Sequence, residues 1–338
     1  MTDSSSIAVG AAFAVTLVIP AVLLPLLRRL HMVDVPNERS AHAEPTARGG
    51  GLAPAAGMAV GLAIAAACSS SVDKRVLWLV LAAGIAAACV GLLEDMRGLS
   101  RLLRAFGQLA IGVVGGAFGS QILDVTSAWA IVGGMALLGG INVVNFMDGL
   151  NGISALHGMI AGVNFIALGA IHDVHWMVMA GAVLVAAFAA FLVWNAFGRL
   201  FLGDVGSYLL GAVVSMIVLL GWMQGLPILA LAAPMAIYVA DAGVTLGSRI
   251  ANAEEWLEAH RDHTYQRLHR RGLSHLTVAG LVALASGACA SLGLIASRQE
   301  GAVRAAASAG IVLVVAGYLA LRALGTPGSA DEGTSRQP

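Results

Sequence analysis

Carboxamides and a carboxylate stand together at the end of a long apolar segment. Asn142, Asn145 and Asp148 recur at every third residue, shortly after the apolar Leu137 and Leu138. In a helix this spacing keeps the three on one side, with a drift of about 60° per step. Their oxygens are hard ligands of the kind that Mg²⁺ prefers. The segment predicts half of a metal site in which one ligand contacts all three, the alternative being a helix end with capping Asn and Gly residues.

A second oxygen ligand is expected in the segment FLGDVGS, which begins at Phe201. A carboxylate beside glycines at the start of a helix is suited to hold a cation that bridges phosphates. The alternative is that Asp204 or Ser207 is only the N-cap of that helix. We take Asp204 as the second metal ligand, together with Asn145.

The adjacent acids Glu94 and Asp95 end another apolar segment and are followed by Arg97, Arg101 and Arg104. Neighbouring helical residues point about 100° apart. We therefore expect one acid to face the site and the other to pair with a nearby Arg, unless the helix unwinds and both share one ligand. The alternative is a solvated helix end with surface ion pairs.

Three other segments carry unusual polar residues. The stretch from Asp34 to Gly51 combines Arg and His side chains with three glycines whose free N–H groups are suited to phosphate, or it is a basic loop with a glycine hinge. Asp241 lies inside an apolar segment, where a carboxylate is costly unless paired or wet, so it is a site candidate or the partner of a buried hydroxyl. A long polar insert follows, without the spacing of a zinc site.

These residues must be positioned by a membrane-embedded helical bundle. The chain of 338 residues is 58% hydrophobic and 11% charged, with a mean hydropathy of +0.84, which excludes an ordinary soluble domain. β-Barrel alternation is absent, and the glycines around Gly112 suit close helix packing in lipid. We expect an all-α integral membrane protein with about eleven transmembrane helices and its active-site loops in the cytoplasm. The apolar segments are 7–27, 52–70, 76–93, 102–119, 128–147, 155–171, 176–196, 207–222, 226–247, 276–296 and 303–322.

The basic residues predict the orientation. With the N-terminus outside, 15 of the 19 Lys and Arg residues face the cytoplasm, as the positive-inside rule requires. Residues 1–325 are then one polytopic domain, and 326–338 form a disordered cytoplasmic tail. No cleavable signal peptide is expected, because the start lacks a basic leader. The three cysteines lie in apolar spans without metal or disulfide spacing.

The motifs together resemble a known family, the polyprenyl-phosphate N-acetylhexosamine-1-phosphate transferases of bacteria. The resemblance covers roughly residues 34–270, and its nearest branch starts O-antigen or capsule repeat units. It departs from the family where Glu94 replaces a usual Asp and where Asn151 replaces a frequent Asp. It rests on DVPNERSAHAEPTARGGG from Asp34, the acidic pair in GLLEDMRGLS, NVVNFMDGLNG from Asn142, FLGDVGS from Phe201 and HRDHTYQRL from His260.

The resemblance implies a reaction and a site. A UDP-activated amino sugar would give its sugar-1-phosphate to undecaprenyl phosphate at the cytoplasmic face of the inner membrane, with release of UMP. Mg²⁺, or Mn²⁺ in its place, would lie between Asn145 and Asp204, and the catalytic groups would be Asp95, Glu94 and Asp148. A homodimer is left open, and no nucleic acid partner is expected. Substrate would be bound by Arg48, Asn142, Asn151, Asp241, Arg261, His263, Tyr265 and Gln266.

A polytopic secondary transporter is the alternative of another class, because many transporters are helical bundles with acids inside the membrane. Transporters place the site near the midplane, often between repeated halves. Here the polar motifs gather at the ends of apolar segments, and no convincing repeat is found. A non-catalytic lipid-binding protein is the third alternative, although it would not need paired oxygen ligands beside glycine loops.

Overall fold

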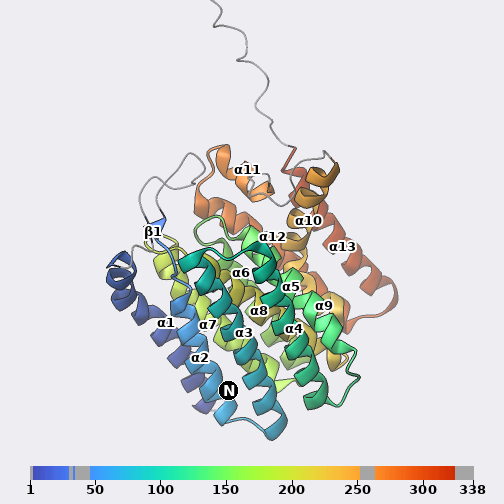
Figure 1. Cartoon of the computed structure of the whole chain (residues 1–338). Coiled ribbons are helices and arrows are strands. Elements are labelled where there is room, and N and C mark those ends of the chain that lie inside the picture. Colours follow the sequence, from blue (N-terminus) through green and yellow to red (C-terminus); the bar gives the residue numbers. More distant parts are fainter. Residues whose placement is uncertain (1–2, 30–32, 35–45, 252–262, 324–338) are drawn as a thin grey trace, which may run out of the picture.

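The part of the chain that the structure describes folds into a bundle of long helices with one short pair of strands (Figure 1). A computed structural model describes residues 3–29, 33–34, 46–251 and 263–323. Two short antiparallel strands, β1 (Val33–Asp34) and β2 (Thr46–Ala47), lie between the first and second helices in the chain. The helices are α1 (Asp3–Arg29), α2 (Leu52–Ala67), α3 (Ser71–Arg97), α4 (Arg101–Leu123), α5 (Trp129–Met147), α6 (Ile153–Ile171), α7 (His175–Asn195), α8 (Gly203–Met223), α9 (Ile228–Ala232), α10 (Ala236–Ala251), α11 (Thr264–Arg270), α12 (His275–Arg298) and α13 (Gly301–Ala320).

The expected membrane architecture is confirmed. Within the described residues, ten helices are long and apolar enough to cross a membrane. The eleventh expected segment is α2, which has 16 residues and a length of about 24 Å, somewhat short of a 30 Å hydrocarbon core. Its crossing of the membrane stays a prediction.

One expected helix is broken. The apolar segment 226–247 forms α9, a 3₁₀ turn η1 (Ala233–Met235) and then α10, rather than a continuous helix. Pro234 lies in the turn, and because proline has no N–H and crowds the preceding turn, it interrupts the α-helical ladder. The break leaves the start of α10 buried and places Asp241 on its buried side.

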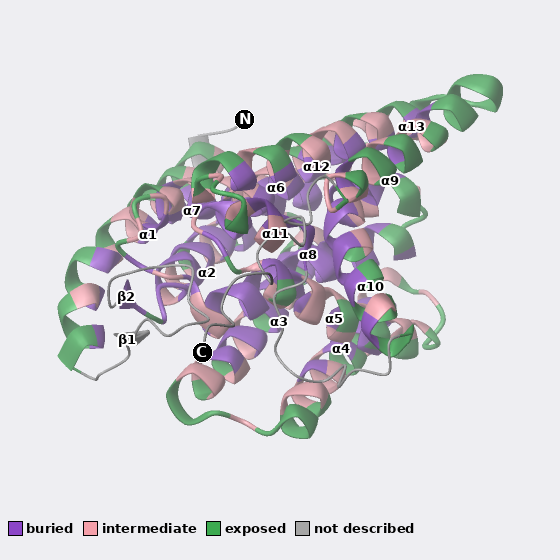
Figure 2. Ribbon diagram, turned by 90° about the horizontal axis from the view of Figure 1, so that it is seen from above, coloured by how far each residue is buried: buried purple, intermediate pink, exposed green. Residues whose placement is uncertain are grey.

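Helix α8 forms the centre of the bundle. Nearly all of its side chains are buried, and it packs chiefly against α3 and α5. Figure 2 shows the buried residues concentrated around α8, with exposed residues on the outer helices. The first turn of α8 contains Asp204, so the expected metal ligand lies on the helix with the most enclosed position in the fold.

Local sequence explains several helix ends and contacts. Ser70, Ser100 and Ser274 each accept a hydrogen bond from a backbone N–H in the first turn of the helix that follows, which satisfies donors that otherwise lack a partner. The expected glycine packing is also found, since a Cβ on Gly112 of α4 would lie 2.3 Å from the carbonyl oxygen of Gly133 on α5.

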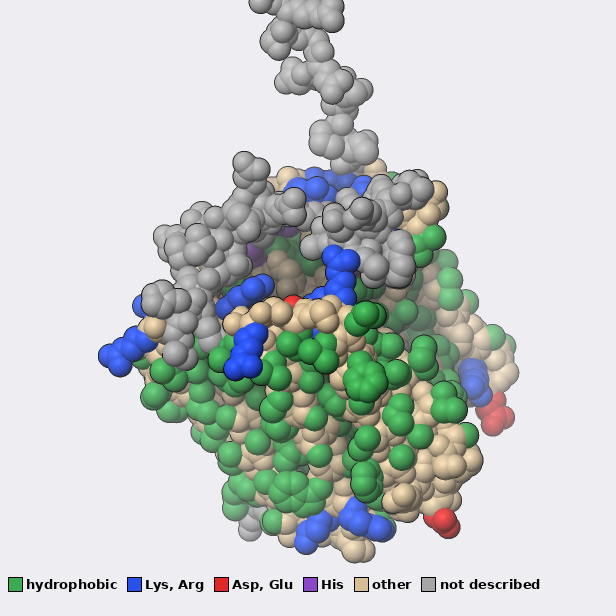
Figure 3. Space-filling model, in the orientation of Figure 1, with side chains coloured by type: hydrophobic (Ala, Val, Ile, Leu, Met, Phe, Trp, Pro, Cys, Tyr) green, Lys and Arg blue, Asp and Glu red, His purple; other side chains and the backbone are tan. Residues whose placement is uncertain are grey.

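The two ends of the bundle differ in charge. On the face shown in Figure 3, Lys and Arg side chains gather toward the upper end, and a smaller group lies at the lower end. Helix α1 begins at the lower end and α13 finishes at the upper end (Figure 1). This distribution agrees with the basic-residue pattern of the sequence, while the orientation across the membrane stays a prediction. The expected disordered tail lies outside the described residues.

Candidate active site

Asn145 and Asp204 meet at the upper end of α5 and α8. The side-chain amide of Asn145 donates to Oδ1 of Asp204 at 2.7 Å and to Oγ of Ser207 at 3.0 Å. The contact joins the last turn of α5 to the first turn of α8, elements 59 positions apart in the chain. The two side chains that the sequence paired as metal ligands are therefore neighbours.

Asp95 caps α8 from a different helix. Its Oδ1 accepts from the backbone N–H of Asp204 at 3.1 Å, and its Oδ2 accepts from that of Val205 at 3.0 Å. A carboxylate at a helix N-terminus satisfies unpaired donors and opposes the helix dipole. Gly203 permits this approach, because its φ is +71° and a Cβ there would lie 2.7 Å from Oδ2 of Asp95. The first turn of α8 is thus held by Asp95 rather than by Asp204 or Ser207 as its own N-cap.

Glu94 points away from its neighbour. Its carboxylate accepts from the guanidinium of Arg104 at 3.0 Å and from the backbone N–H of Leu99. The structure shows the first of the two expected arrangements, in which Asp95 faces the site and Glu94 pairs with Arg104. The catalytic role expected for Glu94 stays a prediction, and its contacts in the structure join α3 to α4.

Asp148 lies directly after α5 and near the other two acids. Its Oδ1 accepts from the hydroxyl of Ser154 at 2.6 Å, and the carboxylates of Asp204 and Asp95 repel it. Burial raises the pKa of Asp148 from 3.8 to about 7, with a further increase from the two neighbouring acids; the Ser154 hydrogen bond and the positive charge of Arg48 oppose this. Asp148 can therefore hold or release a proton near neutral pH.

Arg48 supplies positive charge to the cluster. It is exposed, and its charge acts on Asp95, Asp148 and Asp204 alike.

The glycines that follow Arg48 were expected to offer free N–H groups to a phosphate, but the N–H groups of Gly50 and Gly51 are already bonded. The N–H groups of Gly50 and Gly51 donate to the carbonyl oxygens of Phe201 and Leu202, both at 2.8 Å, so these two amides are not free for phosphate. They fasten the loop to the start of α8 instead.

Two Asn residues of the opening motif lie apart from the acids. The amide of Asn142 donates to Oε1 of Gln108 at 2.6 Å and to the carbonyl of Leu138, one turn farther into the bundle. The backbone N–H of Asn151 donates to Nδ1 of His275. A common ligand for Asn142, Asn145 and Asp148 finds no support, since the three side chains bond to three different neighbours. Substrate binding by Asn142 and Asn151 stays a prediction.

A short helix, α11, lies against the last turn of α5, and at its start are the expected substrate-binding residues His263, Tyr265 and Gln266, whose role stays a prediction. Its N-terminus forms a capping box in which the side chains of His263 and Gln266 bond to each other's backbone N–H groups. The hydroxyl of Tyr265 donates to the carbonyl of Phe146 at 3.0 Å, in the last turn of α5. The three-residue spacing of His263 and Gln266 is the sequence feature that could have predicted the start of this helix, although His is uncommon in a capping box.

Asp241 and Arg261 complete the expected set. Asp241 is fully buried and bonds to Thr264, Thr245 and Tyr318. This agrees with the buried-hydroxyl alternative and leaves no exposed surface for substrate. Arg261 lies outside the described residues.

Sequence reasoning missed residues that position the site. Asn195 accepts from the N–H of Gly152 at 2.6 Å and donates to the carbonyl of Leu200 at 3.0 Å, so it ties the start of α6 to the loop before α8. Ser154 was missed as the partner of Asp148. No motif marks these residues, since single Asn and Ser residues are common in helices.

The oxygen ligands fit a Mg²⁺ ion that is shared with substrate. Among the described residues, no three His, Cys, Asp or Glu side chains lie close enough to hold a metal ion by themselves. Asn145 and Asp204 offer an amide and a carboxylate in contact, and Mg²⁺ in proteins often has one or two carboxylates with water and substrate phosphates completing its shell. This ligand set suits a cation that arrives with a pyrophosphate.

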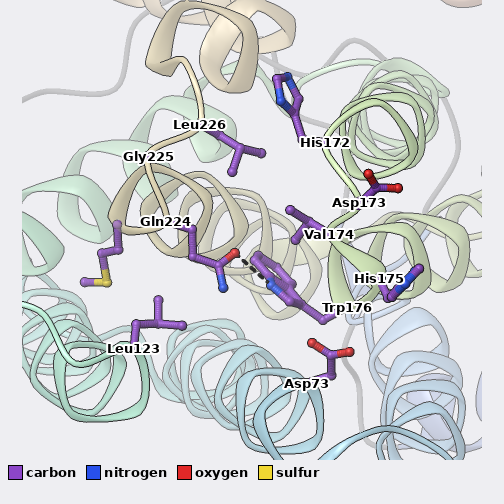
Figure 4. Close-up of a pocket in the computed structure, with 11 residues that line it drawn as sticks. Asp73, Leu123, His172, Asp173, Val174, His175, Trp176, Gln224, Gly225 and Leu226 are labelled. Atoms are coloured by element: carbon purple, nitrogen blue, oxygen red, sulfur yellow. Dashed lines mark hydrogen bonds between the residues drawn. The ribbon is translucent and has the colours of Figure 1, made fainter.

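A separate cavity of about 540 Å³ opens at the opposite end of the bundle (Figure 4). Asp73, near the start of α3, lines it, whereas Asp95 lies some 33 Å away along the same helix. The indole of Trp176 donates to Gln224 in its wall. This cavity is not part of the site around Asp204.

The helices that hold the acids coincide with a family signature. Residues 77–222, from α3 to α8, match the model of Glycosyl transferase family 4. Over this segment the chain is similar to glycosyl transferase family 4. The matched segment of glycosyl transferase family 4 includes all the acids that line the site.

Named relatives cover most of the chain. It is 27% identical over 296 residues to the "Probable undecaprenyl-phosphate N-acetylglucosaminyl 1-phosphate transferase" of Bacillus subtilis, with 81% of each chain covered. It is 26% identical over 297 residues to the undecaprenyl-phosphate alpha-N-acetylglucosaminyl 1-phosphate transferase of Escherichia coli O157:H7, with 80% of this chain and 77% of the relative covered. A phospho-N-acetylmuramoyl-pentapeptide-transferase of Geobacillus kaustophilus is 28% identical over 248 residues, covering 63% and 74%.

Proposed function

We propose that the protein transfers an N-acetylhexosamine-1-phosphate, or a 6-deoxy relative, from a UDP-sugar to undecaprenyl phosphate. The products are a polyprenyl-diphosphate sugar and UMP. The observation that carries the proposal is the contact between Asn145 and Asp204, with Asp95 and Asp148 beside it, at the end of the bundle. The names of the relatives, which are transferases onto polyprenyl phosphates, support the same reaction.

The bond changes follow from the substrates. An oxygen of the lipid phosphate attacks the phosphorus next to the sugar, and the bond from that phosphorus to the bridging oxygen breaks. UMP leaves with the bridging oxygen, and the lipid phosphate gains the sugar-1-phosphate, so that the two phosphates form the diphosphate of the product. Both reactants are anions, so catalysis consists mostly of positioning and charge neutralisation. Bound Mg²⁺ would neutralise pyrophosphate charge beside Asn145 and Asp204.

The protein's own groups have distinct tasks in this proposal. Arg48 adds positive charge near the phosphates, while Asp95 holds the first turn of α8 and so orients Asp204. Asp148, with its pKa of about 7, is suited to accept the last proton of a lipid phosphate whose second pKa is about 6. This assigns proton acceptance to Asp148 and the positioning of Asp204 to Asp95.

The fold suits a substrate that is part lipid and part water-soluble. The acids lie at the ends of α3, α5 and α8, where a lipid phosphate reaches the membrane surface while its isoprenoid chain stays among the helices. A transporter would instead place its main polar site near the midplane. We place the site at the cytoplasmic face of the bacterial inner membrane, and we propose cell-surface polysaccharide synthesis, such as O-antigen or capsule, as the pathway.

The direct test is UMP release by the purified protein. It would be incubated with undecaprenyl phosphate, Mg²⁺ and a panel of UDP-GlcNAc, UDP-GalNAc and their 6-deoxy relatives. We expect UMP and a lipid-linked sugar with at least one donor, and loss of both when EDTA removes the cation. Uptake of substrate into vesicles without UMP release would favour the transporter instead.

A further inference from the structure

The buried carboxylate of Asp241 joins three helices. Its Oδ1 accepts from the backbone N–H of Thr264 at 2.9 Å and from the Thr264 hydroxyl at 3.2 Å, at the start of α11. Its Oδ2 accepts from the hydroxyl of Tyr318 on α13 at 2.7 Å. Nδ1 of His263 is a further 3.5 Å neighbour. A carboxylate with no exposed surface is costly unless such donors surround it, so its position depends on all of them.

The other end of α11 is attached to the same part of α13. Arg271, the C-cap of α11, donates to the carbonyl oxygens of Leu321 at 2.9 Å and Arg322 at 3.1 Å, directly after α13. Arg322 in turn donates to the hydroxyl of Thr245 on α10 at 3.1 Å. The C-terminal end of the seven-residue helix is thus bonded directly to the residues after α13, and its N-terminal end is linked through Asp241 to Tyr318 in the last turn of α13.

Helix α11 in turn contacts the site. Besides the bond from Tyr265 to the carbonyl of Phe146, the hydroxyl of Tyr265 lies only 2.3 Å from where a Cβ on Gly149 would stand, next to Asp148. The rings of Phe146 and His263 stack at 6.4 Å, and those of His263 and Tyr265 at 5.7 Å. A displacement of α11 would therefore move Tyr265, which lies against Gly149 beside Asp148.

We propose that Tyr318 and Asp241 are positioning residues, which hold α11 over the active site from the C-terminal helix. This inference rests on the proposed function for its kinetic consequence. Because α11 carries His263, Tyr265 and Gln266, loosening it should weaken nucleotide-sugar binding more than it slows the chemical step.

The test is the variant Tyr318→Phe, which keeps the ring and removes the hydroxyl. We expect the KM for the active UDP-sugar to rise about tenfold, because a hydrogen bond to a carboxylate is lost, with kcat changed less than about threefold. Hydrogen–deuterium exchange of the full-length protein should be about tenfold faster at residues 264–270. Asp241→Asn should show the same pattern more strongly.

The matched control is Ser308→Ala, which removes a hydroxyl from the same helix. Ser308 donates to the carbonyl of Arg304 within its own helix, so KM and exchange at α11 should equal those of the wild type. Arg271→Gln tests the other end of α11 at an exposed position and serves if Tyr318→Phe does not fold. We expect it to speed exchange at α11 as well.

The outcomes separate the two proposals. Unchanged KM and unchanged exchange in both Tyr318→Phe and Arg271→Gln would overturn the positioning role, and so would a loss of kcat at constant KM and exchange. A wild-type protein that releases no UMP from any UDP-sugar would overturn the proposed function, while the exchange measurement would still decide whether α13 holds α11.

Discussion

Asn145 donates a hydrogen bond of 2.7 Å to Asp204, across the junction between the last turn of α5 and the first turn of α8. Two polar side chains from distant segments are thereby brought into contact at the end of a buried helix. The same first turn is capped by Asp95 from α3. Three helices thus determine where one carboxylate lies, and the predictions below follow from that arrangement.

Replacing Asp204 with Asn should reduce Mg²⁺-dependent UMP release by at least about 100-fold, because the neutral amide is a far weaker partner for a divalent cation and its phosphates. The measurement is UMP formation at saturating substrates across a Mg²⁺ titration. Asp173→Asn is the matched control, since Asp173 lines the cavity at the opposite end and its φ of +56° is tolerated by Asn. Retained turnover in Asp204→Asn would contradict the assignment of Asp204 as a metal ligand.

Asp95→Ala should destabilise the protein more than Asp95→Asn. Alanine removes both acceptors from the first turn of α8, at a cost of about 1–3 kcal/mol for the unsatisfied donors, whereas Asn keeps one acceptor oxygen. Thermal unfolding in detergent measures the order of stability, and UMP release should follow the same order. Equal stability of the two variants, with activity lost equally in both, would instead favour Asp95 as a proton acceptor.

Glu94→Gln should keep UMP release within about fivefold of the wild type, because the carboxylate bonds to Arg104 and Leu99 rather than facing the site. A partly exposed ion pair contributes only about 0.2–1 kcal/mol, so the change in unfolding free energy should be small. Arg104→Gln should have a similar effect, and the double variant should show whether the two residues act through each other. A 100-fold loss of kcat in Glu94→Gln alone would restore the catalytic role.

The cation-free protein should lose stability as the pH rises from about 4 to about 7. Asp148 in the folded protein keeps its proton up to a pKa of about 7, whereas the ordinary value is 3.8, so in this window the folded state binds more protons than the unfolded state. Stability is greatest below the window and falls as the pH passes through it. Thermal unfolding in EDTA measures the slope, and Asp148→Asn should reduce it; an unchanged slope would contradict the raised pKa.

The sequence predicted much of the helix layout because apolar length and spacing are local properties. Each expected apolar segment corresponds to a helix, apart from the break at Pro234. The contact between Asn145 and Asp204 was also predicted. Their spacing in the chain does not indicate it, but the resemblance to the transferase family placed both residues at one metal ion. Proline was visible in the sequence, but whether it ends, bends or breaks a helix depends on the packing around it.

The partners of the polar residues were harder to predict. Asp95 caps α8 rather than its own helix, Gly50 and Gly51 bond to backbone carbonyls, and Asp241 faces α11 and α13. Each contact depends on how two distant helices are rotated and shifted relative to each other. A single sequence contains no direct record of that geometry.

The enclosed position of α8 determines how strongly the lipid bilayer can influence the site. The neighbouring helices separate this central helix from the acyl chains, so changes in bilayer thickness or fluidity act on the outer helices first. Asp204 lies on this enclosed helix, whereas α13, which holds α11, is the least buried of the candidate membrane spans in the described residues. Reconstitution in thin and thick bilayers should therefore alter the affinity for the nucleotide sugar before it alters the chemical step.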